Sequence, residues 1–223
     1  LQLGEPTWIT ERTGKPVLSN IRARDVAAGG HGAPLVSLLD HFLFKSAVRP
    51  QGALNLGGIS NITIAGEGVS TLAYDIGPAN GLLDAAIFAF TKGEKSYDHN
   101  GEIAAKGKID SDTLNALLEE PYYKLPAPKS TGKELFHLDY LLKYFGPVSS
   151  WNLESVMATL LELTAVTVAA EVKRYNLEKL YVAGGGSANP VMMKRIQDQL
   201  PMTEVLTMSA LGIDPRAKEG ITF

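Results

Sequence analysis

The 223-residue sequence contains no cysteine, which excludes disulfide bonds, thiol nucleophiles and cysteine-based metal sites. The four histidines are scattered, without the close spacing of metal ligands, so no metal site is expected. No charge of one sign dominates either: 21 Lys and Arg residues against 24 Asp and Glu residues leave a formal net charge of -3. Nucleic acid and anionic membrane surfaces are therefore not expected partners.

Long hydrophobic runs are also missing. The most apolar stretch, TLLELTAVTVAAEV, is interrupted by Glu162 and Glu171 and is too short and too polar to be expected to span a bilayer. No signal peptide opens the chain, so a cytoplasmic protein is expected. With 45% hydrophobic residues, the composition fits a globular protein of one large domain, or of one domain plus a fragment of another. From the start at Leu1 and the apolar end GITF, both ends are expected to be cut.

The first fifty residues carry weak structural signals. LGEPTWITERTGKPVLSNIRARD mixes short β-prone pieces with Gly and Pro, and VAAGGHGAPL predicts a loop or hinge. LVSLLDHFLF then predicts a helix.

From Gly52 onward the pattern is clear. GALNLG, ISNITIA and VSTLAYD are three β-prone stretches joined by turns so short that they predict an antiparallel meander. NGLLDAAIFAFTKG changes to helical spacing, with Asn80 as the expected N-cap. Asp75 is thereby placed at the end of the third strand.

The second half of the chain alternates helices and strands. Residues 94–150 are polar and irregular and are interpreted as an insertion, and a long helix capped by Asn152 comes next. KLYVAGGGSANPVMMKRIQDQL predicts a buried strand, a triple-glycine turn and a helix capped by Asn189, and TEVLTMS predicts a last strand. Three antiparallel strands followed by strands added through helices predict a mixed sheet covered by helices.

Two glycine-rich turns are candidate phosphate sites. In NLGGISN, Gly57 and Gly58 either supply positive φ for a hairpin or let backbone N–H groups approach a phosphate, with Ser60 or Asn61 adding a hydrogen bond. In VAGGGSANP, Gly184, Gly185 and Gly186 follow a strand and precede a helix, which favours a nucleotide site or a plain tight connection. Neither segment has the spacing of a P-loop or a dinucleotide fingerprint.

Two acids and an arginine are the other candidates. Asp75 either closes its strand and caps the next segment of the chain, or is held over a cleft as a base. Glu219, in DPRAKEG, is a solvated helix residue or a substrate ligand. Arg24 belongs to a cluster that forms surface ion pairs or grips an anionic substrate.

These segments together resemble the anhydro-N-acetylmuramic acid kinases of bacterial cell-wall recycling. The resembling stretches, in the family's order, are RARDVAAGGHGAPL, NLGGISNIT, YDIGPANGLLDAA, YDHNGEIAAKG, APKSTGKELF, VAGGGSANP and GIDPRAKEGITF. The resemblance implies the ribonuclease H-like fold of the actin/sugar-kinase/Hsp70 superfamily: an α/β domain with a mixed five-stranded sheet in β-β-β-α-β-α-β-α order, flanked by helices.

The resemblance also implies a reaction. The family uses ATP and Mg²⁺, opens the anhydro bridge of 1,6-anhydro-N-acetylmuramic acid with water, and phosphorylates the released O6. Asp75 would be the general base. The sugar-binding residues would be Glu219, Arg24 and Asn80, while Gly57, Gly58 and Asn61 would contact the nucleotide phosphates and Gly184 to Gly186 the adenosine.

One departure from the family concerns its first domain. The family opens with a phosphate loop of the form G-T-M-S-G-T-S-x-D-G, which this sequence does not contain. Residues 1–24 are therefore expected to be a remnant of the first domain and a hinge, and residues 25–223 the second domain. Asp75 is expected at the cleft between the domains, with Gly77 and Pro78 turning the chain away to leave its carboxylate free.

Alternatives stay open at this point. The same fold can serve as a nucleotide-binding module without sugar chemistry, and VAGGGSANP can be the dinucleotide loop of an unrelated oxidoreductase, although its glycine spacing is wrong for NAD. The expected partners are the anhydro sugar and ATP, and the sequence leaves a homodimer open.

Overall fold

The computed structural model describes residues 4–30, 32–33, 35–215 and 217–222, and for Glu219 the backbone alone. The chain forms two compact units, Leu1–Leu35 and Val36–Phe223. The division expected from the sequence, after residue 24, stays a prediction. His31 and Pro34, within the predicted hinge, lie outside the described residues.

The N-terminal unit is helical, so the prediction of short β-prone pieces is wrong. It contains α1 (Pro6–Thr13) and α2 (Ile21–Ala27). The Glu5 side chain accepts the N–H of Thr7 at the start of α1, and Pro6 occupies the first turn, where its missing N–H leaves no helical bond unmade. Gly14 ends the helix with φ 63°. These local caps outweigh the β-prone side chains.

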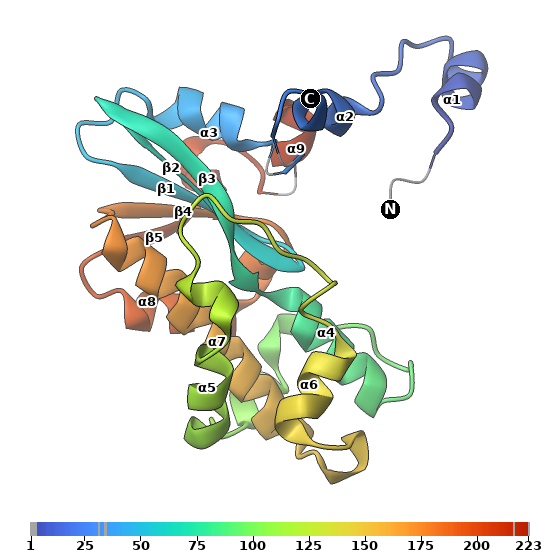
Figure 1. Cartoon of the computed structure of the whole chain (residues 1–223), viewed down its shortest axis with the longest axis vertical. Helices are drawn as coiled ribbons and strands as arrows, with labels where there is room; N and C mark the ends of the chain where they lie inside the picture. The colour runs from blue at the N-terminus through green and yellow to red at the C-terminus, as the bar shows by residue number, and fades with distance from the viewer. Residues whose placement is uncertain (1–3, 31, 34, 216, 223) are drawn as a thin grey trace. The chain divides into compact units, whose positions relative to one another are not determined.

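The larger unit contains every strand of the described chain. Its elements are α3 (Ser37–Phe44), β1 (Gln51–Leu56), β2 (Ile59–Gly66), β3 (Val69–Pro78), α4 (Asn80–Phe90), α5 (Ser111–Leu118), α6 (Leu138–Phe145), α7 (Leu153–Arg174), β4 (Lys179–Ala183), α8 (Pro190–Gln199), β5 (Glu204–Thr207) and α9 (Lys218–Thr222). The sheet order is β3-β2-β1-β4-β5. β1, β2 and β3 are an antiparallel meander, and β4 and β5 join parallel to β1 (Figure 1). The predicted mixed five-stranded sheet is confirmed.

Two clusters of buried side chains cover the two faces of the sheet. On one face, Leu54, Ile62, Tyr74 and Val182 belong to the main core, to which α4, α7 and α8 contribute. On the other face, Ala53 and Tyr181 pack with Phe44 of α3 in a smaller cluster. This alternation follows from the two-residue period of a strand.

The main core is organised around α7. Asn152 caps it as predicted, accepting the N–H of Ser155. With 22 residues the helix is longer than the apolar stretch suggested, and by length and composition alone it could cross a membrane. It is nevertheless mostly buried inside the unit, as the core helix of a globular domain is.

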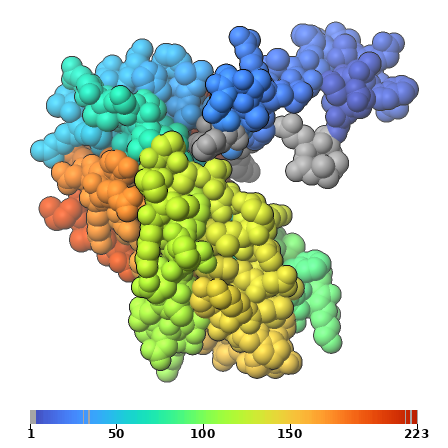
Figure 2. Space-filling view, viewed as in Figure 1, coloured from blue at the N-terminus to red at the C-terminus, as the bar shows by residue number. Residues whose placement is uncertain are grey.

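The insertion, residues 94–150, covers part of the surface of this unit. It supplies α5 and α6 and runs in green and yellow over the face seen in Figure 2. α5 packs against α7 and α6 against α4. The segment just before α6 passes beside β3 (Figure 1), and its residues Ser130 and Thr131 donate hydrogen bonds to Asp75.

Candidate active site

The site lies where β1, β3 and β4 end. These three strands run in the same direction, because β2 is antiparallel to both β1 and β3 and β4 is parallel to β1. Ligands of α/β sheets bind outside the carboxyl ends of such strands. Asp75 of β3, Asn55 of β1 and the glycines after β4 all lie at this edge.

Asp75 does not end its strand. β3 continues to Pro78, and the pairing with β2 shifts between Asn61–Asp75 and Ser60–Gly77, which leaves Ile76 as the extra residue of a β-bulge. Bulges bend a strand and change the direction of its side chains, and they are frequent beside active sites. The predicted turn at Gly77–Pro78 is therefore wrong, and the bulge takes its place.

The carboxylate of Asp75 is buried and held, not free as predicted. Asp75 is 6% exposed, and its Oδ2 accepts hydrogen bonds from Ser130 Oγ and from the backbone N–H of Thr131, each at 3.0 Å. Burial raises the pKa of Asp75, the two donors oppose that rise, and the charge of Glu134 adds to it. The result is a carboxylate of raised pKa, as a general base requires.

A row of polar residues continues across the sheet from Asp75. Asn61 is its direct partner on β2, and Asn55 is the partner of Asn61 on β1. Directly opposed residues project from the same face of a sheet, so the two amides and the carboxylate share that face. Asn61 thus lies beside the predicted base. Asn55, the first letter of NLGGISN, was not singled out in the sequence.

The Gly57–Gly58 turn packs against the start of α4. The carbonyl of Gly58 accepts the N–H groups of Ala79 and Gly81, and that of Gly57 accepts the N–H of Asn80. Neither glycine of the turn has a positive φ, so the hairpin explanation by positive φ is wrong. A Cβ on Gly81 would lie 2.8 Å from the Gly58 oxygen, which shows how closely the two segments approach.

Asn80 is not the helix cap that was predicted. Ala79 holds the N-cap position without a side-chain bond, since the turn carbonyls already satisfy the first N–H groups. The Asn80 side chain instead donates from Nδ2 to the carbonyl of Leu56 at 3.0 Å. It thereby connects α4 to the end of β1.

The three glycines after β4 have different surroundings. Gly184 has φ 81°, and a Cβ there would lie 2.5 Å from Asn55 Oδ1. A Cβ on Gly186 would lie 2.6 Å from the Leu56 Cβ, whereas one on Gly185 would meet only Asn80 Nδ2 at 4.0 Å. Gly184 and Gly186 are therefore required by close packing, and Gly185 faces open space.

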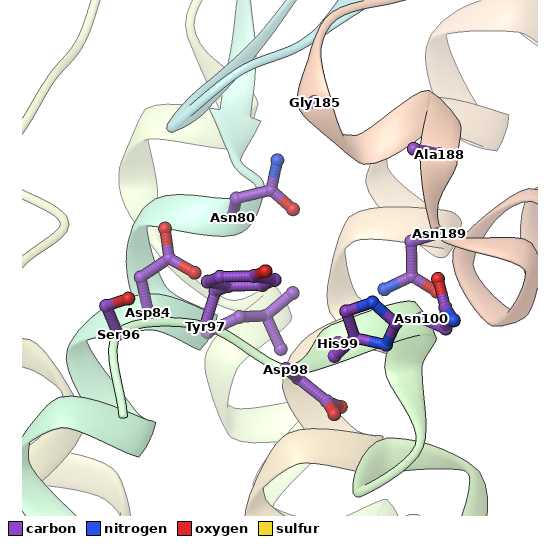
Figure 3. A pocket seen from close by; sticks show the side chains of 11 residues that line it. Asn80, Asp84, Ser96, Tyr97, Asp98, His99, Asn100, Gly185, Ala188 and Asn189 are labelled. Atoms are coloured by element: carbon purple, nitrogen blue, oxygen red, sulfur yellow. The ribbon is translucent and has the colours of Figure 1, made fainter. Parts of the chain in front are cut away.

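That open space is a cavity of about 570 Å³. Figure 3 shows Asn80 and Asp84 of α4 on one side, Tyr97 and His99 from the insertion below, and the Gly185 turn with Asn189, the N-cap of α8, on the other side. Its full lining is Asn80, Leu83, Asp84, Ser96, Tyr97, Asp98, His99, Asn100, Gly185, Ala188 and Asn189. An aromatic ring, amides and a carboxylate around such a volume suit a nucleoside-sized ligand.

Asp84 is the second acid of raised pKa at this site. Its half-buried side chain borders both the main cavity and a neighbouring one of about 450 Å³, which also includes Gly58 and Lys133. Burial raises the pKa of Asp84 to about 6, opposed by the charge of Lys133. Sequence reasoning missed Asp84, Tyr97, Ser130 and Thr131, although all four lie in the segments that carried the family resemblance.

The remaining predicted residues are only partly described. Arg24 lies exposed on α2, in the N-terminal unit. The backbone of Glu219 lies in α9 but its side chain is outside the described residues, so its role stays a prediction. No group of three or more His, Asp or Glu side chains that could hold a metal ion occurs within the described residues.

The strand and helix order, the sheet order and the position of the site define a ribonuclease H-like domain of the actin/sugar-kinase/Hsp70 class. A family model described as anhydro-N-acetylmuramic acid kinase matches residues 1–223. The chain belongs to this family.

Curated relatives carry the same family name. An anhydro-N-acetylmuramic acid kinase of Streptomyces coelicolor is 48% identical over 223 residues, all of this chain and 57% of the relative. One of Rhodococcus erythropolis is 46% identical and one of Pseudomonas fluorescens is 41% identical, over 58% and 61% of their lengths. The chain thus spans about three fifths of the length of these relatives.

Solved structures are more distant. The activator of the 2-hydroxyisocaproyl-CoA dehydratase of Clostridium difficile, with bound ADPNP, aligns with 77% of this chain and 57% of its own, at 16% identity and a TM-score of 0.46. A likeness this distant says nothing about the ligands of this chain.

Proposed function

We propose that this chain is the nucleotide-binding and catalytic part of a cytoplasmic kinase that converts 1,6-anhydro-N-acetylmuramic acid and ATP into N-acetylmuramic acid 6-phosphate and ADP, in cell-wall recycling. The family supports the reaction class. The observation that carries the proposal is the Asp75 carboxylate, held at the same edge of the sheet as the Gly185 turn that borders the cavity.

In this reaction Asp75 accepts a proton from the water that attacks the anomeric carbon of the sugar. The bond from that carbon to O6 breaks, O6 attacks the γ-phosphorus, and ADP leaves. A base beneath a water needs a lone pair directed at it and a pKa not far below the working pH. Two observations support this role for Asp75: Oδ1 accepts no hydrogen bond from the described residues, and burial raises the pKa of the carboxyl.

The cavity would hold the adenosine. The Tyr97 ring can stack on the adenine, and the carboxylate of Asp84 can accept hydrogen bonds from hydroxyl or amino groups of the nucleoside. Mg²⁺ would arrive with the nucleotide, because the described residues hold no cluster of acids for it and Mg²⁺ in kinases takes most of its ligands from phosphate and water.

Ligand-induced thermal stabilisation of the chain tests the nucleotide site. ATP with Mg²⁺ should raise the melting temperature, and NAD should not. Stabilisation by NAD and not by ATP would overturn the proposal in favour of a dinucleotide enzyme.

Substitution of the base tests the chemistry. In the form of this protein that turns over substrate, Asp75→Asn should lower kcat by about 10²–10⁴-fold, because it removes the base and keeps the shape. ATP affinity should be unchanged, since Asp75 does not line the cavity. Near-normal turnover of Asp75→Asn at neutral pH would contradict the general-base role. ATP binding without any turnover of the anhydro sugar in the parent would instead indicate a nucleotide-binding module.

A further inference from the structure

We propose that Lys129, Ser130 and Thr131, named here the strap, hold one oxygen of the Asp75 carboxylate so that the other oxygen is presented as the base. The catalytic meaning rests on the proposed function, whereas the positioning of the carboxylate is testable without turnover. The three residues belong to the loop before α6, which passes beside β3 (Figure 1).

One backbone hydrogen bond joins the strap to the sheet at the residue that carries the carboxylate. β3 is the edge strand of the sheet, and the backbone N–H of Asp75 donates to the carbonyl of Lys129 at 3.0 Å. An edge strand presents unpaired backbone groups, and here the strap covers one of them. Its backbone is thereby fixed relative to Asp75.

Both strap donors bind the same oxygen. Ser130 Oγ and the Thr131 N–H each lie 3.0 Å from Asp75 Oδ2, and no described residue donates to Oδ1. Two donors on one oxygen fix the plane of the carboxylate and leave the lone pairs of the second oxygen in a defined direction. Hydrogen bonds to the charged form also lower the pKa, which offsets part of the rise caused by burial.

The buried side chain of Lys129 holds the strap against the rest of its loop. It is 6% exposed, and its Nζ donates to the carbonyls of Tyr122 and Tyr123 at 3.2 Å each and lies over the Tyr122 ring. The Tyr122 hydroxyl in turn donates to the backbone carbonyl of Asp75 at 2.7 Å. The loop is therefore closed on itself, and both of its ends bind the backbone of Asp75.

The titratable groups near this carboxylate lie in the strap and its loop. Glu134, beyond the strap, raises the pKa of Asp75, and the loop carries Tyr122, Tyr123 and Lys129, whose Nζ is held by two backbone carbonyls. On the sheet side the neighbour is the neutral Asn61. Removal of a strap donor should therefore appear directly in the titration of Asp75.

The first experiment is a ¹³C NMR titration of the aspartate carboxyls in the chain, with Asp75 assigned by its loss in Asp75→Asn. Ser130→Ala should raise the pKa of Asp75 by about one unit, because a hydrogen bond to a charged group is lost. Ser130→Thr, which keeps the hydroxyl, should restore the parent value, and Ser149→Ala, on the exposed turn Val148–Ser150, should not change it. An unchanged pKa in folded Ser130→Ala would overturn the proposal.

The second experiment removes the hydrogen bonds of Lys129 to the carbonyls of Tyr122 and Tyr123. Lys129→Met removes the Nζ donor and should speed amide hydrogen exchange at Asp75 and Thr131, whereas Lys108→Met, at an exposed position, should not. Equal exchange in the two variants would overturn the role of Lys129. If Lys129→Met does not fold, the Ser130→Ala titration decides the proposal alone.

Turnover separates positioning from mere stability. In the form of this protein that turns over substrate, Ser130→Ala should shift the acid limb of the pH profile of kcat/KM, which reports the free enzyme, to higher pH by the same amount as the NMR pKa, with ATP affinity unchanged. A uniform loss of rate at every pH would overturn the positioning role. An NMR shift without any shift of the pH profile would overturn Asp75 as the base, and with it the proposed mechanism.

Discussion

At the scale of single residues, the site contains two carboxylates of raised pKa, Asp75 and Asp84, whose environments differ. Asp75 has its burial offset by two hydrogen-bond donors, and Asp84 has its burial offset by one nearby charge, Lys133. The two donors to Asp75 fix the orientation of its carboxylate. Asp84, with a pKa of about 6, is a hydrogen-bond acceptor that becomes charged near neutral pH. The two acids are therefore suited to different tasks.

Asp84 should make stability depend on pH. Because its pKa is raised to about 6, the folded state binds more protons than the unfolded state between about pH 4 and pH 6, and the free energy of unfolding falls as pH rises through that window. Asp84→Asn removes this titrating group, so its free energy of unfolding should not fall in that pH window. The variant should match the parent near pH 4 and melt at a higher temperature at pH 7. Glu67→Gln, at an exposed turn, is the control, and a melting difference that does not grow with pH would contradict the assignment.

Gly185 should report on the nucleotide. Its Cβ position is open and borders the cavity, so Gly185→Val should fold normally and fill space that the ligand needs. We expect ATP affinity, measured by calorimetry, to fall about ten- to hundredfold.

Gly184→Val is the matched contrast. It should destabilise the fold itself, because Gly184 has a positive φ and a close contact with Asn55. Unchanged ATP affinity in folded Gly185→Val would place the nucleotide elsewhere.

At the scale of elements, close approaches between segments position the site. The β1–β2 turn satisfies the first N–H groups of α4, and the glycine turn after β4 packs on the end of β1. A further link joins α3 to α9: Lys218 Nζ lies 2.7 Å from Asp40 Oδ1, and both side chains are almost fully buried. This pair fixes the segment that carries Glu219.

Breaking that pair should be strongly destabilising. Lys218→Met leaves the Asp40 carboxylate buried without its cation, and we expect the free energy of unfolding to fall by about 3–5 kcal/mol at neutral pH. Burial raises the pKa of Asp40 and Lys218 opposes the rise, so the loss should shrink at lower pH, where Asp40 becomes neutral.

Denaturant unfolding measures the effect. Lys194→Met, in an exposed pair with Asp198, should change the free energy of unfolding by about 0.5 kcal/mol or less. If both lysine variants behave alike, the buried pair does not stabilise the fold.

At the scale of the whole molecule, the chain contains a five-stranded sheet and matches only part of the length of its relatives. It spans 57% of the Streptomyces relative, and its sequence does not contain the family's first phosphate loop. Phosphoryl transfer depends on positioning and charge stabilisation around the phosphates. The described part contains the candidate base Asp75 and a cavity of about 570 Å³.

The 223-residue chain alone should therefore fold, bind ATP weakly and show almost no kinase turnover. Folding is expected because helices cover the sheet with a large buried cluster on one face and a smaller one on the other. A coupled ADP-release assay with the anhydro sugar is the measurement. Turnover on the order of 1–100 per second, the ordinary range of kinases, would show that these residues suffice for the reaction.

Much of the fold was predictable because its signals are local. The two-residue period of the meander, the helical period after Asn80, and the caps at Asn152 and Asn189 depend on neighbours within a few residues. The α1 helix was missed because its end signals, the Glu5 cap, Pro6 in the first turn and Gly14 after the last, outweigh β-prone side chains. The family and the candidate base Asp75 also followed from short motifs.

Only the tertiary structure decided how the site is assembled. Ser130 and Thr131 reach Asp75 across 55 and 56 residues of sequence, and Asn80 binds Leu56 across 24. Hydrogen bonds between such distant residues depend on sheet register, on the bulge at Ile76 and on the course of the insertion. The spacing of apolar residues along the sequence does not indicate any of these. The sequence by itself thus determined which strands and helices form and which acid is the candidate base. The folded chain determined which oxygen of that acid is held, because the two donors belong to a loop that only packing brings to the edge of the sheet.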